Sequence, residues 1–222
     1  MDQTACAVGG FITIDFADPT SPVIEKMDFD LTAAGYSLCI VNTGGNHADL
    51  NEDYASVPAE MKAVARALGV SVLRETTEEA VLANIVRLRE EVGDRAILRA
   101  LHFFGENRRV AAQVEALRAG DIEAFKAGVT ASGNSSFKYL QNVYTNKNIA
   151  EQGLSLALCL TEDFLAGTGA VSRVHGGGFA GTIQAFVPVD DTAAYAEKMN
   201  AVFGEGACHI LSVRPSGACR IL

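Results

Sequence analysis

Ser172-Arg-Val-His-Gly-Gly-Gly-Phe-Ala-Gly-Thr182 is the stretch that decides how this chain folds. Four glycines, Gly176, Gly177, Gly178 and Gly181, fall within six positions, and an apolar run lies on either side. Glycine costs roughly 0.5–1 kcal/mol relative to alanine inside regular structure, so such a cluster indicates positive φ angles or a closely approaching backbone. Two interpretations follow: a tight turn between two strands, or a turn packed against a ligand site.

The segments around this cluster predict strands and one helix. Residues 170–174 lead into the glycines and residues 182–188 leave them, both with the apolar, β-branched character of strands. Residues 191–203 have helical spacing and begin at Asp191 or Thr192, which can cap a helix. Residues 207–213 predict a last strand. The end of the chain is therefore strand, turn, strand, helix, strand.

The earlier part of the chain predicts strands first and helices afterwards. The expected strands are residues 11–16, 23–31 and 36–42, and the turn signals between them favour antiparallel pairing. The expected helices are 50–68, 76–92, 94–119, 122–130, 137–144 and 148–165, from apolar residues at three-to-four spacing. Residues 132–136, Ser-Gly-Asn-Ser-Ser, are expected to be a polar break between two of them.

This order of elements predicts an α+β fold in one domain, residues 1–222. The C-terminal unit, completed by an N-terminal strand, fits a ferredoxin-like (split βαβ) antiparallel sheet with helices on one face. The helices between the first strands and the glycine cluster then form a helical insert.

Charge and composition exclude several classes of function. The net charge of −9 argues against nucleic acid or an anionic membrane surface as a general partner, and no apolar run is long enough to span a membrane. The five cysteines are scattered and odd in number, which fits reduced thiols in a cytoplasmic protein. Because neither a Cys-x-x-Cys pair nor a His/Cys cluster occurs, we expect no metal ligands.

Three familiar motifs match the glycine cluster poorly. Gly176-x-Gly178-x-x-Gly181 has the spacing of the dinucleotide-binding fingerprint, but a strand follows it where that fingerprint requires a helix. His175-Gly-Gly-Gly-Phe179 resembles the oxyanion loop of lipases, but no Gly-x-Ser-x-Gly elbow occurs. The chain also has no Gly-x-x-x-x-Gly-Lys-Ser/Thr phosphate loop.

The run from Arg173 to Thr182 resembles the third conserved motif of the GHMP small-molecule kinases, whose C-terminal domains have the α+β fold predicted above. The wider chain resembles the galactokinase branch of that family. The matching stretches are Met1-Asp2-Gln3 with residues 9–16, Asn51-Glu52-Asp53-Tyr54 with the helix at 60–69, residues 102–109 with the helix at 111–120, and the segment around Ser132. Each stretch alone is unspecific, whereas their combination over nearly the whole chain is specific.

The resemblance implies roles for individual residues. Asp2 would face the O1 hydroxyl of the sugar, as a general base or as an electrostatic partner of the attacking oxygen. Tyr54 would hydrogen-bond a sugar hydroxyl, and residues 176–178 would let the backbone pack beneath the sugar site and the phosphate loop. Arg173, His175 and Gly181 complete the glycine motif. The plainer alternatives are a disordered Asp2 at an exposed terminus and a Tyr54 that is only a half-buried aromatic at a helix start.

The resemblance also implies that this chain corresponds to the C-terminal half of a galactokinase. The N-terminal lobe of such an enzyme carries a galactose-signature segment and a Gly/Ser-rich loop for ATP phosphates, and neither occurs in these 222 residues. Residues 1–16 would be a remnant of the junction with that lobe. A truncated gene, an internal start and a separately made half are all compatible with this. We expect the complete enzyme to use ATP and Mg²⁺ on galactose or a related hexose, and the chain alone to bind neither cofactor and to show no turnover.

A second hypothesis belongs to another class of function, a catalytically silent binding or assembly module. The surface near residues 1–10 and the glycine cluster is expected to be apolar and to need cover, which makes a homodimer plausible. The chain also departs from the family pattern. His175 stands where a small hydroxyl residue is usual, Ala180 where glycine is common, and Ser132-Gly133-Asn134 lacks a frequent histidine. These departures concern sugar specificity more than family membership.

Overall fold

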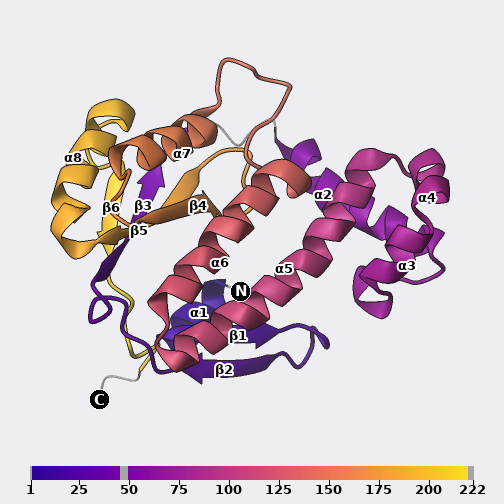
Figure 1. Ribbon diagram of the computed structural model, residues 1–222, viewed down its shortest axis with the longest axis horizontal. Helices are drawn as coiled ribbons and strands as arrows, with labels where there is room; N and C mark the ends of the chain where they lie inside the picture. The colour runs from indigo at the N-terminus through magenta and orange to yellow at the C-terminus, as the bar shows by residue number, and fades with distance from the viewer. Residues whose placement is uncertain (1, 46–49, 220–222) are drawn as a thin grey trace.

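The computed structural model describes residues 2–45 and 50–219, and of Asp2 it describes only the backbone (Figure 1). The strands are β1 (Phe11–Asp15), β2 (Val23–Met27), β3 (Tyr36–Asn42), β4 (Val171–His175), β5 (Thr182–Pro188) and β6 (Cys208–Leu211). The α-helices are α1 (Asp2–Val8), α2 (Asn51–Ala67), α3 (Glu78–Ala83), α4 (Ile85–Glu91), α5 (Asp94–Ala119), α6 (Ile122–Ser135), α7 (Gly153–Phe164) and α8 (Thr192–Phe203). Short turns of other helix types are η1 (Leu73–Glu75), η2 (Ser136–Leu140) and η3 (Val189–Asp191).

The main sheet has the predicted split βαβ arrangement. Its strand order is β4-β5-β3-β6, and every neighbouring pair is antiparallel. The chain leaves β3, passes through the helical insert and α7, and returns as β4, with β5 lying between those two strands. From β5 it crosses through α8 to β6 at the other side of β3. The α+β, ferredoxin-like prediction is therefore confirmed.

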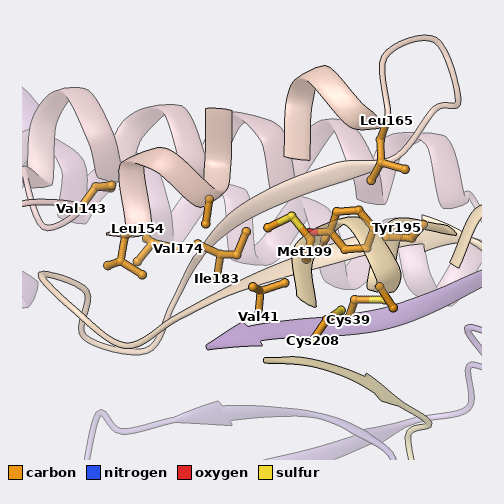
Figure 2. Close-up of a cluster of buried hydrophobic side chains, with 14 residues drawn as sticks. Cys39, Val41, Val143, Leu154, Leu165, Val174, Ile183, Tyr195, Met199 and Cys208 are labelled. Carbon is orange, nitrogen blue, oxygen red and sulfur yellow. The ribbon is translucent and has the colours of Figure 1, made fainter. Parts of the chain in front are cut away.

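One face of this sheet packs against α7 and α8 (Figure 2). Alternate residues of β3, β4 and β5 point into this core, because successive side chains of a strand lie on opposite faces. The buried members from the sheet are Cys39, Val41, Val174, Ile183, Ala185 and Val187, and the helices add Leu154, Ala157, Tyr195, Ala196 and Met199. Tyr195 is fully enclosed and its hydroxyl lies 2.8 Å from the buried Thr161 Oγ1, so the tyrosine hydroxyl is satisfied within this layer.

The opposite face of the sheet is covered in part by the insert and by a separate hairpin. Phe186 of β5 packs with Phe125 and Val129 of α6, Leu117 of α5 and Met27 of β2. The strands β1 and β2 pair only with each other, in a two-stranded sheet of their own. Of the three expected N-terminal strands, the last one, β3, is thus the one that enters the main sheet.

The insert is built on two long helices that lie side by side, α5 and α6 (Figure 1). α5 ends at Gly120, which has a left-handed backbone, and Asp121 caps α6 by accepting a hydrogen bond from the amide of Ala124. The N-terminal end of α5 packs with α2, α3 and α4 in a second core that includes Val64, Leu73, Val81, Leu88 and Ile97. In this arrangement the first turn of α2 lies next to the glycine cluster.

Four expectations about the helices were wrong, one of them the helix expected over residues 137–144, where the helical turn ends at Leu140. Residues 76–92 form two helices, because the chain breaks at Asn84, whose side chain donates to Ala80 O. Residues 132–136 are no polar break: α6 continues to Ser135, and a π-helical turn follows. The helix expected from residue 148 begins only at Gly153.

The first described residues form α1, which ends against the C-terminal tail. The amide of Ala218 donates to Ala7 O at 3.0 Å, and the amide of Gly10 donates to Arg214 O at 2.8 Å. Within residues 2–45 and 50–219, no helix combines the length and apolar character needed to cross a bilayer.

Candidate functional site

The glycine cluster is a turn of residues 176–181 that joins β4 to β5. Its φ angles are positive at Gly176 (71°), Gly178 (83°), Gly181 (96°) and also at Phe179 (60°). L-residues rarely adopt this region, so three of these four positions are glycine and Phe179 is the exception. The first interpretation, a strand-to-strand turn, is therefore correct for the backbone.

Tyr54, in the first turns of α2, lies directly on the glycine turn. Its hydroxyl donates to Gly178 O at 2.7 Å, and its ring meets Phe179 edge-on with centroids 5.4 Å apart. A Cβ at Gly177 would come within 2.8 Å of the Tyr54 ring. Burial raises the pKa of Tyr54, so the phenol stays protonated and able to donate at neutral pH. The structure thus brings together two sequence-predicted site residues that are 124 positions apart.

Asn142 holds the turn from another direction. Its main-chain oxygen accepts from the amide of Phe179 at 2.5 Å, and its Nδ2 donates to Gly177 O at 3.1 Å. A Cβ at Gly178 would lie 1.9 Å from Asn142 O, so no side chain fits there. The sequence offered no signal for Asn142, because nothing distinguishes a single asparagine between Gln141 and Val143 in a segment expected to be helical.

The room left by the glycines is therefore mostly filled by this chain itself. Tyr54 occupies the space at Gly177 and Asn142 occupies that at Gly178, while nothing among the described residues lies within 4 Å of a Cβ built at Gly176. The expectation that residues 176–178 make room for a neighbouring lobe therefore stays a prediction at Gly176, whereas this chain itself fills the space at Gly177 and Gly178. Gly181 binds β3 instead: its carbonyl accepts from the amide and the hydroxyl of Thr43 at 2.8 and 2.9 Å.

His175 and Arg173 lie two residues apart on the same face of β4 but have different surroundings. His175 is exposed at the end of the strand, and its Nδ1 lies 3.0 Å from Thr182 Oγ1 across the turn. Arg173 reaches away from the turn into the helical insert, where it contacts Ser132 and Glu106 and donates to Ser136 Oγ at 3.4 Å. His175 is thus placed to touch a ligand beside the turn, whereas Arg173 anchors the strand below it.

A buried polar cluster joins β4 to α5 and α6 at this point. Glu106 of α5 accepts from Arg109 Nε at 2.7 Å and from the hydroxyl of Ser132, and it pairs with Arg173 at 3.4 Å. Ser135 accepts from Arg109 at 2.8 Å. The stretch that looked like a polar break therefore supplies hydroxyls to one carboxylate and two arginines.

His102 completes this cluster as a neutral side chain. Its Nδ1 lies 2.9 Å from Ser135 Oγ, and burial lowers the pKa of its ring. A neutral imidazole can accept the hydroxyl hydrogen of Ser135, while the Ser135 oxygen accepts from Arg109. The cluster thus positions β4 and its turn, and it does not face the turn itself.

We expect protonation of the Glu106 carboxylate to lower the stability of the fold in acid. Burial raises the pKa of Glu106, but hydrogen bonds from Ser132 and Arg109 and the charge of Arg173 outweigh this, so the pKa lies below its usual 4.5. A carboxyl with a lowered folded-state pKa stabilises the fold above the unfolded pKa and loses this contribution as pH falls through the folded pKa. We expect the urea midpoint of the wild type to fall below pH 4.5 more steeply than that of Glu106→Gln. Parallel curves for the two proteins would contradict this assignment.

A cavity of about 760 Å³ opens beside the turn. Its wall includes Gly44, Gly45, Phe179 and Ala180, together with Lys147 and the start of α7. Lys147 pairs with Glu52 at 2.7 Å and lies 3.5 Å from Asp53, which ties this loop to the start of α2 next to Tyr54. A ligand at the turn therefore has a hollow next to it that is lined by both polar and apolar residues.

The backbone of Asp2 begins α1. The side chain of Asp2 falls outside the described part of the structure, and its proposed role stays a prediction. In the described ranges, no three His, Cys, Asp or Glu side chains lie close enough to hold a metal ion.

Comparison with known proteins gives a consistent result. No family model matches the chain. It is 31% identical to a galactokinase of Actinobacillus pleuropneumoniae serotype 5b over 188 residues, which cover 85% of this chain and 46% of that protein. It is 30% identical to a galactokinase of Streptomyces coelicolor, covering 100% of this chain and 55% of that protein. The chain thus spans about half the length of the curated relatives it matches.

Solved structures support the same relationship at the level of the fold. Lactococcus lactis galactokinase, solved with galactose, matches 97% of this chain and 53% of that one with a TM-score of 0.71 and 22% identity. Mevalonate kinase of L. major, solved with R-mevalonate, matches 98% of this chain with a TM-score of 0.58 and 19% identity. The resemblance to galactokinases is therefore borne out by sequence and by fold. The chain belongs to the galactokinase family of GHMP kinases.

Proposed function

We propose that this chain forms the sugar-facing part of a galactokinase-like site, at the contact between Tyr54 and the glycine turn. The reaction of the complete site is transfer of the ATP γ-phosphoryl group to the anomeric hydroxyl of galactose. The observation that carries this proposal is the 2.7 Å hydrogen bond from Tyr54 to Gly178 O, which joins two separate motifs of the family resemblance.

The chemistry of these groups suits a sugar hydroxyl. A phenol oxygen that donates to one carbonyl can accept from another hydroxyl, so Tyr54 can bridge the turn and a sugar. His175 is exposed at the edge of the same turn and offers a second polar contact. Asp2 begins α1 and is proposed as the group near the reacting O1, where one carboxylate can accept its proton or orient it. Galactose is the sugar named for the solved Lactococcus lactis relative.

ATP and Mg²⁺ are proposed for the complete site and are assigned to none of the described residues. Positioning and charge compensation supply most of the catalysis in phosphoryl transfer. Bound ATP and Mg²⁺ would bring the phosphoryl group and its charge neutralisation. The residues of this chain would bind and orient the acceptor sugar.

The proposal predicts that galactose binds at Tyr54. We expect a galactose titration to shift the backbone NMR signals of Tyr54 and residues 176–179, and Tyr54→Phe to weaken binding about tenfold because one hydrogen bond is lost. Tyr139→Phe is the matched control, since Tyr139 is a tyrosine of η2 that is 45% exposed. Shifts confined to other regions, or equal affinity in all three proteins, would contradict the proposal.

The same samples test turnover. With ATP and Mg²⁺ added, we expect no galactose phosphate from the 222-residue chain, whose sequence has no Gly/Ser-rich phosphate loop. Formation of galactose 1-phosphate would show a complete site in this chain and would overturn the expected inactivity. Absence of any galactose binding would favour a silent binding or assembly module.

A further inference from the structure

Three unusual backbone features meet at one contact, between Asn142 and the glycine turn. Gln141 (φ 56°) and Phe179 (φ 60°) are the non-glycine residues with positive φ in the described ranges. The π-helical turn η2 ends immediately before Gln141, and the amide of Phe179 donates to Asn142 O. Strain of this kind persists only where the surrounding structure imposes it, and it concentrates at functional sites.

The Asn142 side chain itself is incompletely satisfied. It is 4% exposed, and its Oδ1 is one of two buried side-chain polar atoms without a hydrogen-bond partner among the described residues, the other being Ser155 Oγ. Reversing the amide does not help, because Oδ1 would then face Gly177 O, which is also an acceptor. An unpaired buried oxygen destabilises a fold, so stability does not explain why an amide stands here.

The hydrogen bonds of Asn142 all act on the turn. Nδ2 fixes the carbonyl of Gly177, and the main-chain oxygen fixes the amide of Phe179, on either side of Gly178. The carbonyl of Gly178 is the one that Tyr54 binds. The side chain of Asn142 therefore determines the position of Gly178 O, the carbonyl oxygen to which Tyr54 donates.

We propose that Asn142 is a positioning residue that holds the glycine turn in its left-handed shape, so that Gly178 O orients the Tyr54 hydroxyl for its ligand. This inference rests on the proposed function, since it assigns Tyr54 to the sugar. It adds a residue that acts through the turn and does not itself touch the ligand. Asn142 O is packed against Gly178 without space for a Cβ, so small changes at Asn142 reach the turn directly.

The test uses Asn142→Leu, because leucine has nearly the shape of asparagine and cannot hydrogen-bond. If Asn142 is a positioning residue, the urea midpoint stays equal or rises, since the unpaired oxygen is removed together with one hydrogen bond. Hydrogen exchange of the Phe179 amide becomes about tenfold faster, and galactose affinity falls about tenfold. Asn142→Ala provides the same readouts if the leucine variant folds poorly.

The outcomes separate this inference from the proposed function. Galactose binding to wild type with unchanged affinity in both variants overturns the positioning role and leaves the proposed function intact. Failure of the wild type to bind galactose overturns the proposed function. Hydrogen exchange of the Phe179 amide then tests the positioning role by itself. Faster exchange in the Asn142 variant, at an unchanged urea midpoint, supports that role. Unchanged exchange, or a lowered midpoint with uniformly faster exchange, overturns it.

Discussion

Gly178→Ala is expected to lower the free energy of unfolding by about 2–5 kcal/mol, as the sum of about 1–2 kcal/mol for a left-handed residue and about 1–3 kcal/mol for overpacking. The added Cβ would lie 1.9 Å from Asn142 O and 2.8 Å from Asn142 Nδ2. Backbone atoms cannot move aside as a flexible side chain does, so the turn must separate from Asn142. Urea unfolding followed by circular dichroism measures the change.

Gly176→Ala is the matched control for this substitution. Gly176 has a similar φ of 71°, but none of the described atoms lies within 4 Å of an added Cβ. We therefore expect only the left-handed penalty of about 1–2 kcal/mol. Equal losses in the two variants would show that φ alone matters and that the contact with Asn142 does not constrain the turn.

The sheet could be predicted because its signals are local. β3 and β5 are apolar runs bounded by turn residues, and the glycines between β4 and β5 permit one connection only. Given a strand, turn, strand, helix and strand in that order, few topologies remain, and the split βαβ sheet is one of them. The pairing of β1 with β2 was harder, because nothing in the sequence distinguishes a separate hairpin from two more strands of the main sheet.

Polar groups that meet across the fold could not be predicted. Ser132 and Ser135 resemble loop residues in sequence, since serine favours turns where its hydroxyl binds nearby backbone. In the structure these hydroxyls bind Glu106 and Arg109 of α5, so α6 continues through them. The partner decides the conformation, and the partner is 26 residues away.

Only part of the candidate site could be predicted from the sequence. The family resemblance selected Tyr54 and the glycine turn, and the structure joins them. It did not select Asn142, because the left-handed Gln141 and the π-helical turn before it have no signature in sequence. The shape of the turn is thus determined by a segment that composition and periodicity describe only as the end of a helix.

Arg99 is the most deeply buried charge of the described residues, with a side chain 1% exposed. Its guanidinium donates to Glu60 Oε2 at 2.8 Å, to Ser56 Oγ at 2.9 Å and to Leu140 O at 3.0 Å. Burial lowers the pKa of Arg99, and the Glu60 carboxylate opposes this. Glu60 therefore supplies a counter-charge that offsets the burial of the Arg99 guanidinium, and through Leu140 Arg99 holds the segment that leads to Asn142.

Glu60→Ala is expected to destabilise the protein by about 3–5 kcal/mol, because it leaves a buried guanidinium without its counter-charge. Glu91→Ala is the matched control: it removes the Arg87–Glu91 pair, in which both side chains are 45% exposed, and should change stability by less than about 1 kcal/mol. Chemical denaturation of both variants measures the difference. Similar small losses in the two would show that Arg99 does not need Glu60.

The double variant Glu60→Leu with Arg99→Met separates the charge from the packing. Leucine and methionine fill most of the same volume, and replacing both members of a buried pair is often neutral where removing one is costly. We expect the double variant to recover most of the stability lost by Glu60→Ala, which a thermodynamic cycle with the single variants measures. In the double variant we also expect hydrogen exchange of the Phe179 amide to be faster than in wild type. Methionine cannot hydrogen-bond Leu140 O, so it cannot hold the segment that leads to Asn142 and the turn.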